Sequence, residues 1–415
     1  MKAKIKEKIK SYLKKKGYAL VNLNDVNNKN NAELQKTLGG INIAENLDYI
    51  INTEKIPFSE KDFKSRDDSI YTVSWVIPPL GIGSGGHINI FRAIDHIGRQ
   101  GIKSKVYIYG GNEGTATKDL REFVQKYYGV DLKHNEIYPS VKMMDYSDAV
   151  IATSWITAYV VNNFDNAVSK FYFVQDFEPF FFAVGSYYYL AENTYKMGFR
   201  GITAGDWLKD KLRDEYKMET ESFWFAYDKD LYKPYERKDN KNRIFFYARP
   251  YTERRAFEIG VLAFEVLAKR IPDVEILFMG QKLDDYKFGF NYVDKGIVDI
   301  RNLAEEYSQC DMCLVLSSTN LSLLPMEVMA SDSVVVSNYG ANNEWLLNED
   351  NAILVECDPI KIADKLEYYL KNKEELARYR ENSKKYIRNI TWENELKKVS
   401  DFIKRSVDKD MGDLK

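Results

Sequence analysis

Four glycines between residues 81 and 86 form the most distinctive segment of the chain. They follow an apolar run at 73–77 and precede a helical pattern at 88–99. Such a loop lets backbone N–H groups and a helix N-terminus approach a phosphate or a developing anion. The letters also match G-x-G-x-x-G, the fingerprint of dinucleotide-binding proteins. The next apolar run ends without the carboxylate that would hold an NAD ribose, so a nicotinamide cofactor is disfavoured.

Two arginines in the second half of the chain could bind phosphate. Arg249 ends an apolar run at 244–247, and Arg255 follows six residues later, beside Arg254. A guanidinium suits phosphate because it stays charged and can donate two parallel hydrogen bonds. Surface ion pairs are the alternative role for both side chains.

Alternating patterns predict the elements that position these residues. Apolar runs alternate with amphipathic stretches, which indicates largely parallel sheets wound by helices. The polar segment 227–242 lacks periodicity and is typical of a linker. The predicted strands are 73–77, 106–109, 149–152, 171–174, 201–204 and 223–226 before the linker, and 244–247, 275–279, 312–316 and 334–337 after it. We therefore expect two doubly wound Rossmann-like halves facing a cleft at the carboxyl ends of both sheets.

Composition narrows the class of protein. A length of 415 residues favours two domains, and 60 basic against 62 acidic residues give no support for nucleic acid as a partner. Cys310 and Cys313 are expected to be a buried thiol pair, because no second cysteine or histidine pair completes a metal site. The chain lacks a signal peptide and any run of about 18 apolar residues, so a cytoplasmic location is expected.

The N-terminal segment is basic. Its first 16 residues contain eight lysines, with Ile5, Ile9 and Leu13 spaced by four. This pattern predicts an amphipathic helix that either lies on anionic lipid or packs its apolar stripe on the body of the protein.

The succession of segments in the second half resembles a known family. The strand with Arg249 and Arg255 is followed by residues 272–280, by Leu324-Pro-Met-Glu-Val-Met-Ala330 and by Val334-Val-Val-Ser-Asn-Tyr-Gly340. This order resembles the nucleotide-binding domain of retaining GT-B glycosyltransferases of the family 4 type. In the first half, residues 85–102, 201–209 and 225–234 resemble the same family. The loop at 77–87 is most similar to that of bacterial rhamnosyltransferases that build S-layer and surface-polysaccharide glycans.

The resemblance implies a fold, a division into domains and a reaction. The fold class is α/β, of the GT-B type. The expected domains are an N-terminal helical extension at 1–65, an acceptor-side domain at 66–234, a nucleotide-sugar domain at 235–390, and a C-terminal helix at 391–415 returning to the first domain. The reaction is metal-independent hexosyl transfer with retention, without a cofactor, and with L-rhamnose from a dTDP donor as the expected sugar. The expected acceptor is a lipid-linked or oligosaccharide surface glycan, reached at the inner face of the membrane.

The resemblance also implies the donor site. Arg249 and Arg255 would bind the diphosphate, with backbone N–H groups of Ser322 and Leu323, and Glu327 would accept hydrogen bonds from the ribose. Glu327 could instead only complement a helix dipole. Thr319 stands where the family usually has the first glutamate of an E-x7-E pair, and Asn320 replaces a glycine. Contacts from Thr319 and Asn320 to the donor sugar are expected, and a hydroxyl at this position suits a deoxy sugar.

In the first half, catalytic contacts are expected from Gly85, Gly86, Gln175 and Asp176. Gln175 stands at the family's usual histidine position. His87 and Glu178 are candidates for acceptor contacts, with helix capping as the alternative for His87. The aromatic residues at 180–182 and 187–189 could receive the acceptor or simply pack.

Three other interpretations of the function remain open. Asp228 and Asp230 form a D-x-D, which would bind a metal in a GT-A enzyme, but the second α/β half argues against that fold. A non-hydrolysing sugar-nucleotide epimerase would share the double fold, but it usually needs histidines, and the chain has three. A catalytically inactive GT-B module that binds a glycan or a partner enzyme is suggested by Thr319.

Overall fold

The computed structural model describes residues 43–133 and 135–414, and the chain divides into two compact units between Glu54 and Lys55. The first unit contains the short helices α4 (Ile43–Asn46) and α5 (Asp48–Ile51). The basic helix predicted at 1–16 lies outside the described residues. Within the described part of the chain, no helix has both the length and the apolarity needed to cross a membrane.

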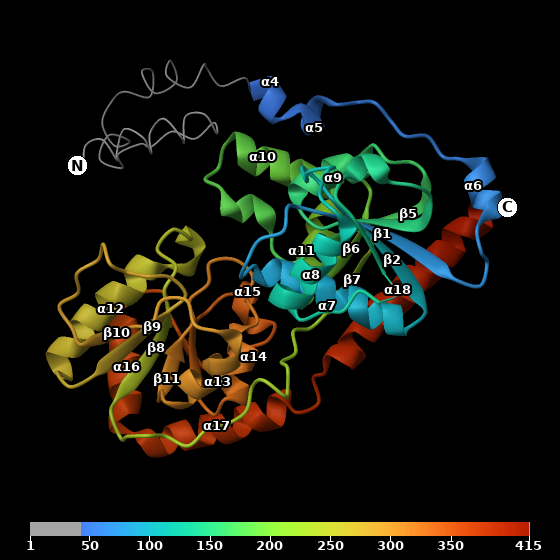
Figure 1. The fold of residues 1–415 in the computed structure, drawn as a ribbon. Coiled ribbons are helices and arrows are strands. Elements are labelled where there is room, and N and C mark those ends of the chain that lie inside the picture. Colours follow the sequence, from blue (N-terminus) through green and yellow to red (C-terminus); the bar gives the residue numbers. More distant parts are fainter. Residues whose placement is uncertain (1–42, 134, 415) are drawn as a thin grey trace, which may run out of the picture. The chain divides into compact units, whose positions relative to one another are not determined.

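The N-terminal half of the second unit is built on a parallel seven-stranded sheet with the order β3-β2-β1-β4-β5-β6-β7 (Figure 1). The strands are β1 (Tyr71–Ile77), β2 (Ile102–Ile108), β3 (Glu136–Tyr138), β4 (Ser147–Ala152), β5 (Ala167–Val174), β6 (Arg200–Ala204) and β7 (Thr220–Phe223). The helices that follow β1, β2, β4 and β6 are α7 (Gly85–Arg99), α8 (Thr117–Tyr128), α9 (Trp155–Asn162) and α11 (Asp206–Tyr216). The other helical segments of this half are α6 (Glu60–Ser65), η1 (Val141–Met143), η2 (Glu178–Phe181), α10 (Ser186–Asn193) and η3 (Thr194–Lys196).

The C-terminal half repeats this plan with six parallel strands in the order β10-β9-β8-β11-β12-β13. They are β8 (Arg243–Tyr247), β9 (Glu275–Met279), β10 (Tyr292–Asp294), β11 (Met312–Leu314), β12 (Val334–Asn338) and β13 (Ile353–Val355). Its helices are η4 (Glu253–Arg255), α12 (Phe257–Arg270), α13 (Ile300–Ser308), α14 (Leu324–Ala330), α15 (Ala341–Glu344), α16 (Pro359–Lys371) and α17 (Lys373–Ile387). Both halves thus have the doubly wound strand order, in which ligands bind beyond the carboxyl ends of the strands where the order reverses.

The last described helix, α18 (Trp392–Leu414), lies against α7, β5 and β7 of the N-terminal half. Leu396, Val399 and Ile403 lie on its buried face, at spacings of three and four residues. Arg200 at the start of β6 forms two hydrogen bonds with the Asp410 carboxylate, at 2.6 and 2.8 Å. The N-terminal half is therefore completed by a segment that follows the C-terminal half in the chain.

Residues 55–65, which the sequence placed in the N-terminal extension, pack on the N-terminal half. Ile56 pairs with Phe164 in an isolated β-bridge, and the backbone N–H of Ser59 donates to Asn166 Oδ1 at 3.0 Å. The compact unit begins at Lys55 for this reason.

An aromatic contact joins the two halves. The Trp345 ring, which follows α15, packs against Trp224 and Phe225 of the N-terminal half, with ring centroids 5.8 Å apart in both pairs. Gly205 has φ +89°, and a Cβ there would lie 2.5 Å from the Trp345 ring. Glycine is needed at this position both for its backbone conformation and for the close approach of the indole.

Candidate active site

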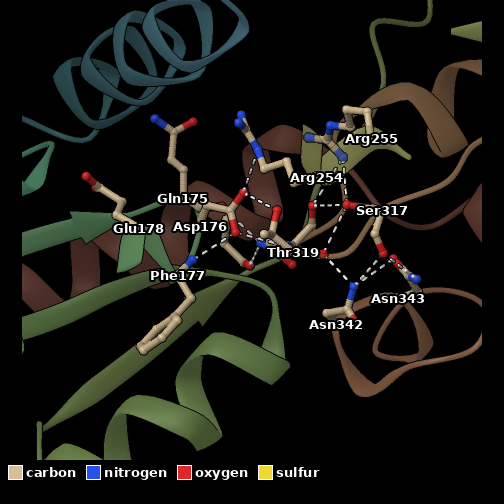
Figure 2. A network of polar contacts seen from close by, with 12 residues as sticks. Gln175, Asp176, Phe177, Glu178, Arg254, Arg255, Ser317, Thr319, Asn342 and Asn343 are labelled. Carbon is tan, nitrogen blue, oxygen red and sulfur yellow. Dashed lines mark hydrogen bonds and ion pairs between the residues drawn. The ribbon is translucent and has the colours of Figure 1, made fainter. Parts of the chain in front are cut away.

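The carboxyl ends of β5 and β11 meet through Asp176. This residue follows β5 by two positions, and its buried carboxylate accepts hydrogen bonds from the Thr319 hydroxyl and the Asn320 backbone N–H, both at 2.8 Å (Figure 2). The structure therefore brings together a predicted catalytic residue of the first half and two predicted donor-sugar residues of the second.

Two arginines of η4 act electrostatically on this carboxylate. Arg254 Nε lies 3.8 Å from Asp176 Oδ2, and the Arg254 guanidinium lies 4.3 Å from the centroid of the Phe181 ring. Arg255 Nη1 donates to Ser317 Oγ at 2.7 Å. Burial lowers the pKa of Arg255, and the negative charge of Asp176 acts in the opposite direction. Burial likewise raises the pKa of Asp176, opposed first by Arg255.

The turn that carries these arginines has an unusual backbone. Ala256, which joins η4 to α12, has φ +49°. For a residue other than glycine the left-handed region costs about 1–2 kcal/mol. Such conformations persist where the surroundings hold them, often at functional sites.

The amide group of Asn320 connects the halves through its Nδ2 and is held within the C-terminal half through its Oδ1. Its Nδ2 donates to the backbone carbonyls of Gln175 at 2.9 Å and Ala204 at 2.7 Å, while its Oδ1 accepts from Trp345 Nε1 at 2.9 Å. The side chain is completely buried. Thr319 and Asn320 thus make contacts between the halves in the structure, and these contacts engage the polar groups expected to reach the donor sugar.

Gln175 links the end of β5 to the glycine loop. Its Nε2 donates to the Gly86 carbonyl at 3.1 Å, and its Oε1 accepts from Asn89 at 3.0 Å. A Cβ on Gly86 would lie 3.4 Å from Gln175 Nε2, whereas one on Gly85 would meet nothing within 4 Å. Gly86 is therefore in contact with Gln175, and Gly85 lies beside open space.

The two acceptor candidates are engaged elsewhere. His87 is buried, with Nδ1 2.7 Å from Ser84 Oγ and Nε2 3.2 Å from the Pro78 carbonyl. Burial lowers the pKa of His87. The buried Glu178 accepts hydrogen bonds from the Trp155 N–H, at the start of α9, and from the Tyr172 hydroxyl, both at 2.8 Å. Burial raises the pKa of Glu178 to about 7. The structure thus gives His87 a place in the packing of the loop and Glu178 a place at a helix N-terminus.

The remaining residues predicted for the donor site lie beyond the carboxyl end of β8 and at the start of α14. Arg249 is half-buried, and its Nε donates to the Tyr247 hydroxyl at 2.8 Å. The Leu324 N–H points back to Ser322 Oγ at 3.4 Å, and Leu323 is the N-cap residue of α14. Glu327 lies in the first turn of α14, where burial raises its pKa to about 7, opposed by Tyr232 and Arg92.

Arg92 is a residue that the sequence analysis did not select. It lies on α7 of the N-terminal half, yet it acts electrostatically on Glu327 of the C-terminal half. Its guanidinium lies 4.4 Å from the centroid of the Trp392 ring, and its Nη1 donates to Asn89 Oδ1 at 3.2 Å. Gly86, Asn89 and Arg92 are three residues apart and share a face of α7. The available signal was the pair of polar residues at 89 and 92, on the helix face that begins at Gly86.

Two residue pairs that the sequence analysis considered as metal ligands, and one cavity, remain to be placed. Asp228 Oδ1 accepts from the Asp230 N–H at 3.0 Å, the pattern of a local Asx turn. Within residues 43–133 and 135–414, no group of three or more His, Cys, Asp or Glu side chains could hold a metal ion. Cys310 and Cys313 are both buried, as predicted. A cavity of about 310 Å³ is lined by residues that include Thr72 and Asp148, the second residues of β1 and β4, and none of the candidate site residues lines it.

The comparisons with known proteins agree with this architecture. Residues 130–204 match the family model of the WsaF N-terminal domain, and residues 242–367 match that of the WsaF C-terminal domain. The O-antigen biosynthesis protein RfbC of Myxococcus xanthus is 31% identical over 342 residues, which are 80% of this chain and 27% of RfbC. The chain thus spans about a quarter of the length of this relative.

Two solved structures share the fold at low identity. Sucrose-phosphate synthase of Thermosynechococcus elongatus has a TM-score of 0.61 at 12% identity, over 81% of this chain and 98% of that one. Anabaena HepE, in complex with UDP and glucose, has the same TM-score and identity, over 81% of this chain and 100% of that one. The chain therefore has the GT-B fold of glycosyltransferases, with segments that match both domains of the WsaF family.

Proposed function

We propose that the protein is a glycosyltransferase that moves a sugar from a nucleoside diphosphate donor to a growing bacterial surface polysaccharide. The observation that carries the proposal is the convergence of Arg254, Arg255 and the loop 317–320 on the end of β5, beside the glycine loop. The similarity to an O-antigen biosynthesis protein and to both WsaF domains supports the surface-polysaccharide class.

The chemistry of the leaving group explains the arginines. When the bond from the sugar to the diphosphate breaks, negative charge grows on the diphosphate, and fixed positive groups stabilise it best in a site from which water is excluded. Arg255 is half-buried and oriented by Ser317, while Arg249 is oriented by the Tyr247 hydroxyl. Backbone N–H groups at Ser322 and Leu323 would assist.

Glu327 would bind the nucleoside. Its ionised carboxylate can accept hydrogen bonds from both ribose hydroxyls. Arg92 and Tyr232 favour that ionised form, against the effect of burial. The same helix start would then hold the ribose and the diphosphate.

The finer proposal is transfer of L-rhamnose from a dTDP donor, with retention and without a metal ion. The form of the glycine loop and the hydroxyl of Thr319 support it. In a retaining reaction, the leaving phosphate would take the proton of the acceptor hydroxyl while the backbone of Gly85 and Gly86, with Gln175, lines the reacting centre. Phe180, Tyr187 and Tyr189 are 42%, 49% and 55% exposed, and they offer aromatic surface to a lipid-linked or oligosaccharide acceptor. A cytoplasmic location at the inner face of the membrane belongs to this proposal.

A catalytically inactive GT-B module is the second candidate. The observation that favours it is the use of Thr319 and Asn320 for contacts between the halves, where the family usually has a carboxylate and a glycine.

One experiment separates these functions. Calorimetric titration with dTDP-, UDP- and GDP-sugars identifies the donor, and turnover is then measured with a lipid-linked acceptor. Arg249→Ala should reduce turnover about 100-fold or more, the scale on which enzymes lose rate when one group that stabilises transition-state charge is removed. Arg213→Ala, at an arginine paired with Asp210 and Asp214 on the surface, is the matched control. Binding without transfer would favour the inactive module, and absence of nucleotide binding would overturn the proposal. The anomeric configuration of the product tests retention.

A further inference from the structure

Donors of one half surround a carboxylate of the other. The Thr319 hydroxyl, the Asn320 N–H and the Arg254 and Arg255 guanidiniums all belong to the C-terminal half, while Asp176 comes from the N-terminal half (Figure 2). Arg254 and the two neutral donors face the carboxylate, and Arg255, which donates to Ser317 Oγ, adds a second positive charge that acts on it. Such a set of donors and charges can bind an anion. Among the described residues, the hydrogen bonds to the Asp176 carboxylate come from the C-terminal half, apart from the one donated by the N–H of its neighbour Phe177.

The carboxylate does not satisfy all of these donors. Asp176 Oδ1 accepts from Asn320 N and from its own neighbour Phe177 N, each at 2.8 Å, and Oδ2 accepts from Thr319. Arg254 Nε is buried and has no hydrogen-bond partner among the residues that the structure describes. Its distance of 3.8 Å to Oδ2 is too long for a hydrogen bond. A phosphate group has more acceptor oxygens than a carboxylate and could satisfy Arg254 as well.

The charges around Asp176 favour an anion that carries more negative charge than a carboxylate. Two arginines against one aspartate leave the cluster with an excess positive charge. Burial raises the pKa of Asp176, which means that burial makes the ionised form of this side chain less favourable. A diphosphate carries more negative charge and would compete effectively for the same donors.

We propose that Asp176 is an internal anion that competes with the donor's diphosphate for Arg254, Arg255, Thr319 and Asn320, so that donor binding releases Asp176 and loosens this contact between the halves. The inference rests on the proposed function, because it takes the donor to be a nucleoside diphosphate sugar. It assigns Asp176 a role before the chemical step. A fixed structural latch between the halves is the competing role.

Asp176→Asn tests the proposal, because the two roles predict changes of opposite sign. An internal anion excludes phosphate, so its neutral isostere should bind inorganic pyrophosphate and UDP or dTDP roughly tenfold more tightly, the effect of about one pKa unit of charge interaction at such distances. If Asp176 only holds the two halves together, its replacement should leave the affinity for these phosphate compounds unchanged or weaken it. Asp165→Asn is the control, because this substitution removes the same charge from the same half. Asp165 pairs with Lys55 and Lys170.

The outcomes distinguish the two proposals. Tighter binding by Asp176→Asn, with Asp165→Asn like wild type, supports the internal anion. Equal or weaker binding by a folded Asp176→Asn overturns it and leaves the proposed function standing. If neither wild type nor Asp176→Asn binds a nucleoside diphosphate, the proposed function fails and this inference fails with it.

A second measurement needs no variant. Hydrogen–deuterium exchange of the wild-type protein with and without saturating pyrophosphate should show faster exchange at residues 175–178 when pyrophosphate is bound, because the Phe177 N–H donates to Asp176. Unchanged or slower exchange in this segment would contradict the release of Asp176.

Discussion

Glu327, like Glu178, has a pKa raised to about 7, and it is the one of the two that lies at the proposed nucleoside site. Burial raises this pKa from 4.5 to about 7. A carboxyl group whose pKa is higher in the folded state contributes stability below its unfolded pKa, and that contribution is lost as the pH rises through the folded value. The stability of the fold therefore falls between about pH 4.5 and 7 and stays at the lower level above that, where Glu327 is in the ionised form that would bind a ribose.

We expect Glu327 to make nucleoside diphosphate binding stronger as the pH rises through about 7. Because phosphate also titrates near pH 6, the informative quantity is the ratio of wild-type to Glu327→Gln affinity at each pH. This ratio should grow between about pH 6 and 8 in calorimetric titrations with dTDP or UDP. Glu349→Gln, at an exposed glutamate bonded to Tyr339, should behave as wild type.

Arg92 provides an independent check on that assignment. Arg92 favours ionised Glu327, so Arg92→Gln should move the midpoint of the affinity ratio to a higher pH. Arg99→Gln on the same helix, where Arg99 pairs with Asp95, should leave the midpoint in place. An unmoved midpoint in Arg92→Gln would show that Arg92 does not act on the carboxylate.

At the scale of elements, the start of α7 is where the glycine loop meets β5. Gly85 and Gly86 are adjacent in the first turn, but only Gly86 faces Gln175 closely. Gly85→Ala should stabilise the protein by about 0.5 kcal/mol, because alanine is the better helix former. Gly86→Ala should be less stable than Gly85→Ala, because its Cβ presses on the Gln175 amide. Thermal unfolding of the two variants tests this, and equal stability would show that the contact imposes no constraint.

The sequence predicted the elements with long apolar runs, and the structure confirms them. Strands such as β1, β5 and β9 and the helix α7 lie where the periodicity placed them, whereas β7 ends at Phe223, where the predicted strand 223–226 begins. β3, β10 and β13 were missed, because three residues are too few to show an alternating pattern and all three lie at or near a sheet edge. α10, with the sequence SYYYLAEN, was missed because only Ala191 is buried and no apolar stripe marks it.

The candidate site was predictable to the extent that it lies at strand ends. Asp176 and Arg249 follow β5 and β8, where a doubly wound sheet places functional residues. The bond from Asp176 to Thr319 could not be predicted, because the two residues are 143 positions apart and belong to different sheets. Arg92 was missed for the same reason, since its partner Glu327 lies in the other half.

At the scale of the whole molecule, the junction around Trp345 should control how the halves are held. Gly205 and Gly198 both have positive φ, at +89° and +80°. Alanine should cost about 1 kcal/mol at either position through the backbone alone. Gly205→Ala should cost more, because its Cβ meets the Trp345 indole, whereas a Cβ on Gly198 meets nothing within 4 Å. Denaturant unfolding of both variants gives the comparison, and equal losses would mean that the indole moves aside freely.

The return of α18 to the N-terminal half has a consequence for biosynthesis. The C-terminal half is continuous in the chain, but the N-terminal sheet keeps part of its apolar face, including Phe171, for a helix that leaves the ribosome after every other described element. The C-terminal half can therefore fold before α18 has packed on the N-terminal sheet. During that interval the nascent chain presents an open apolar surface, and binding sites for chaperones that protect such surfaces should concentrate there.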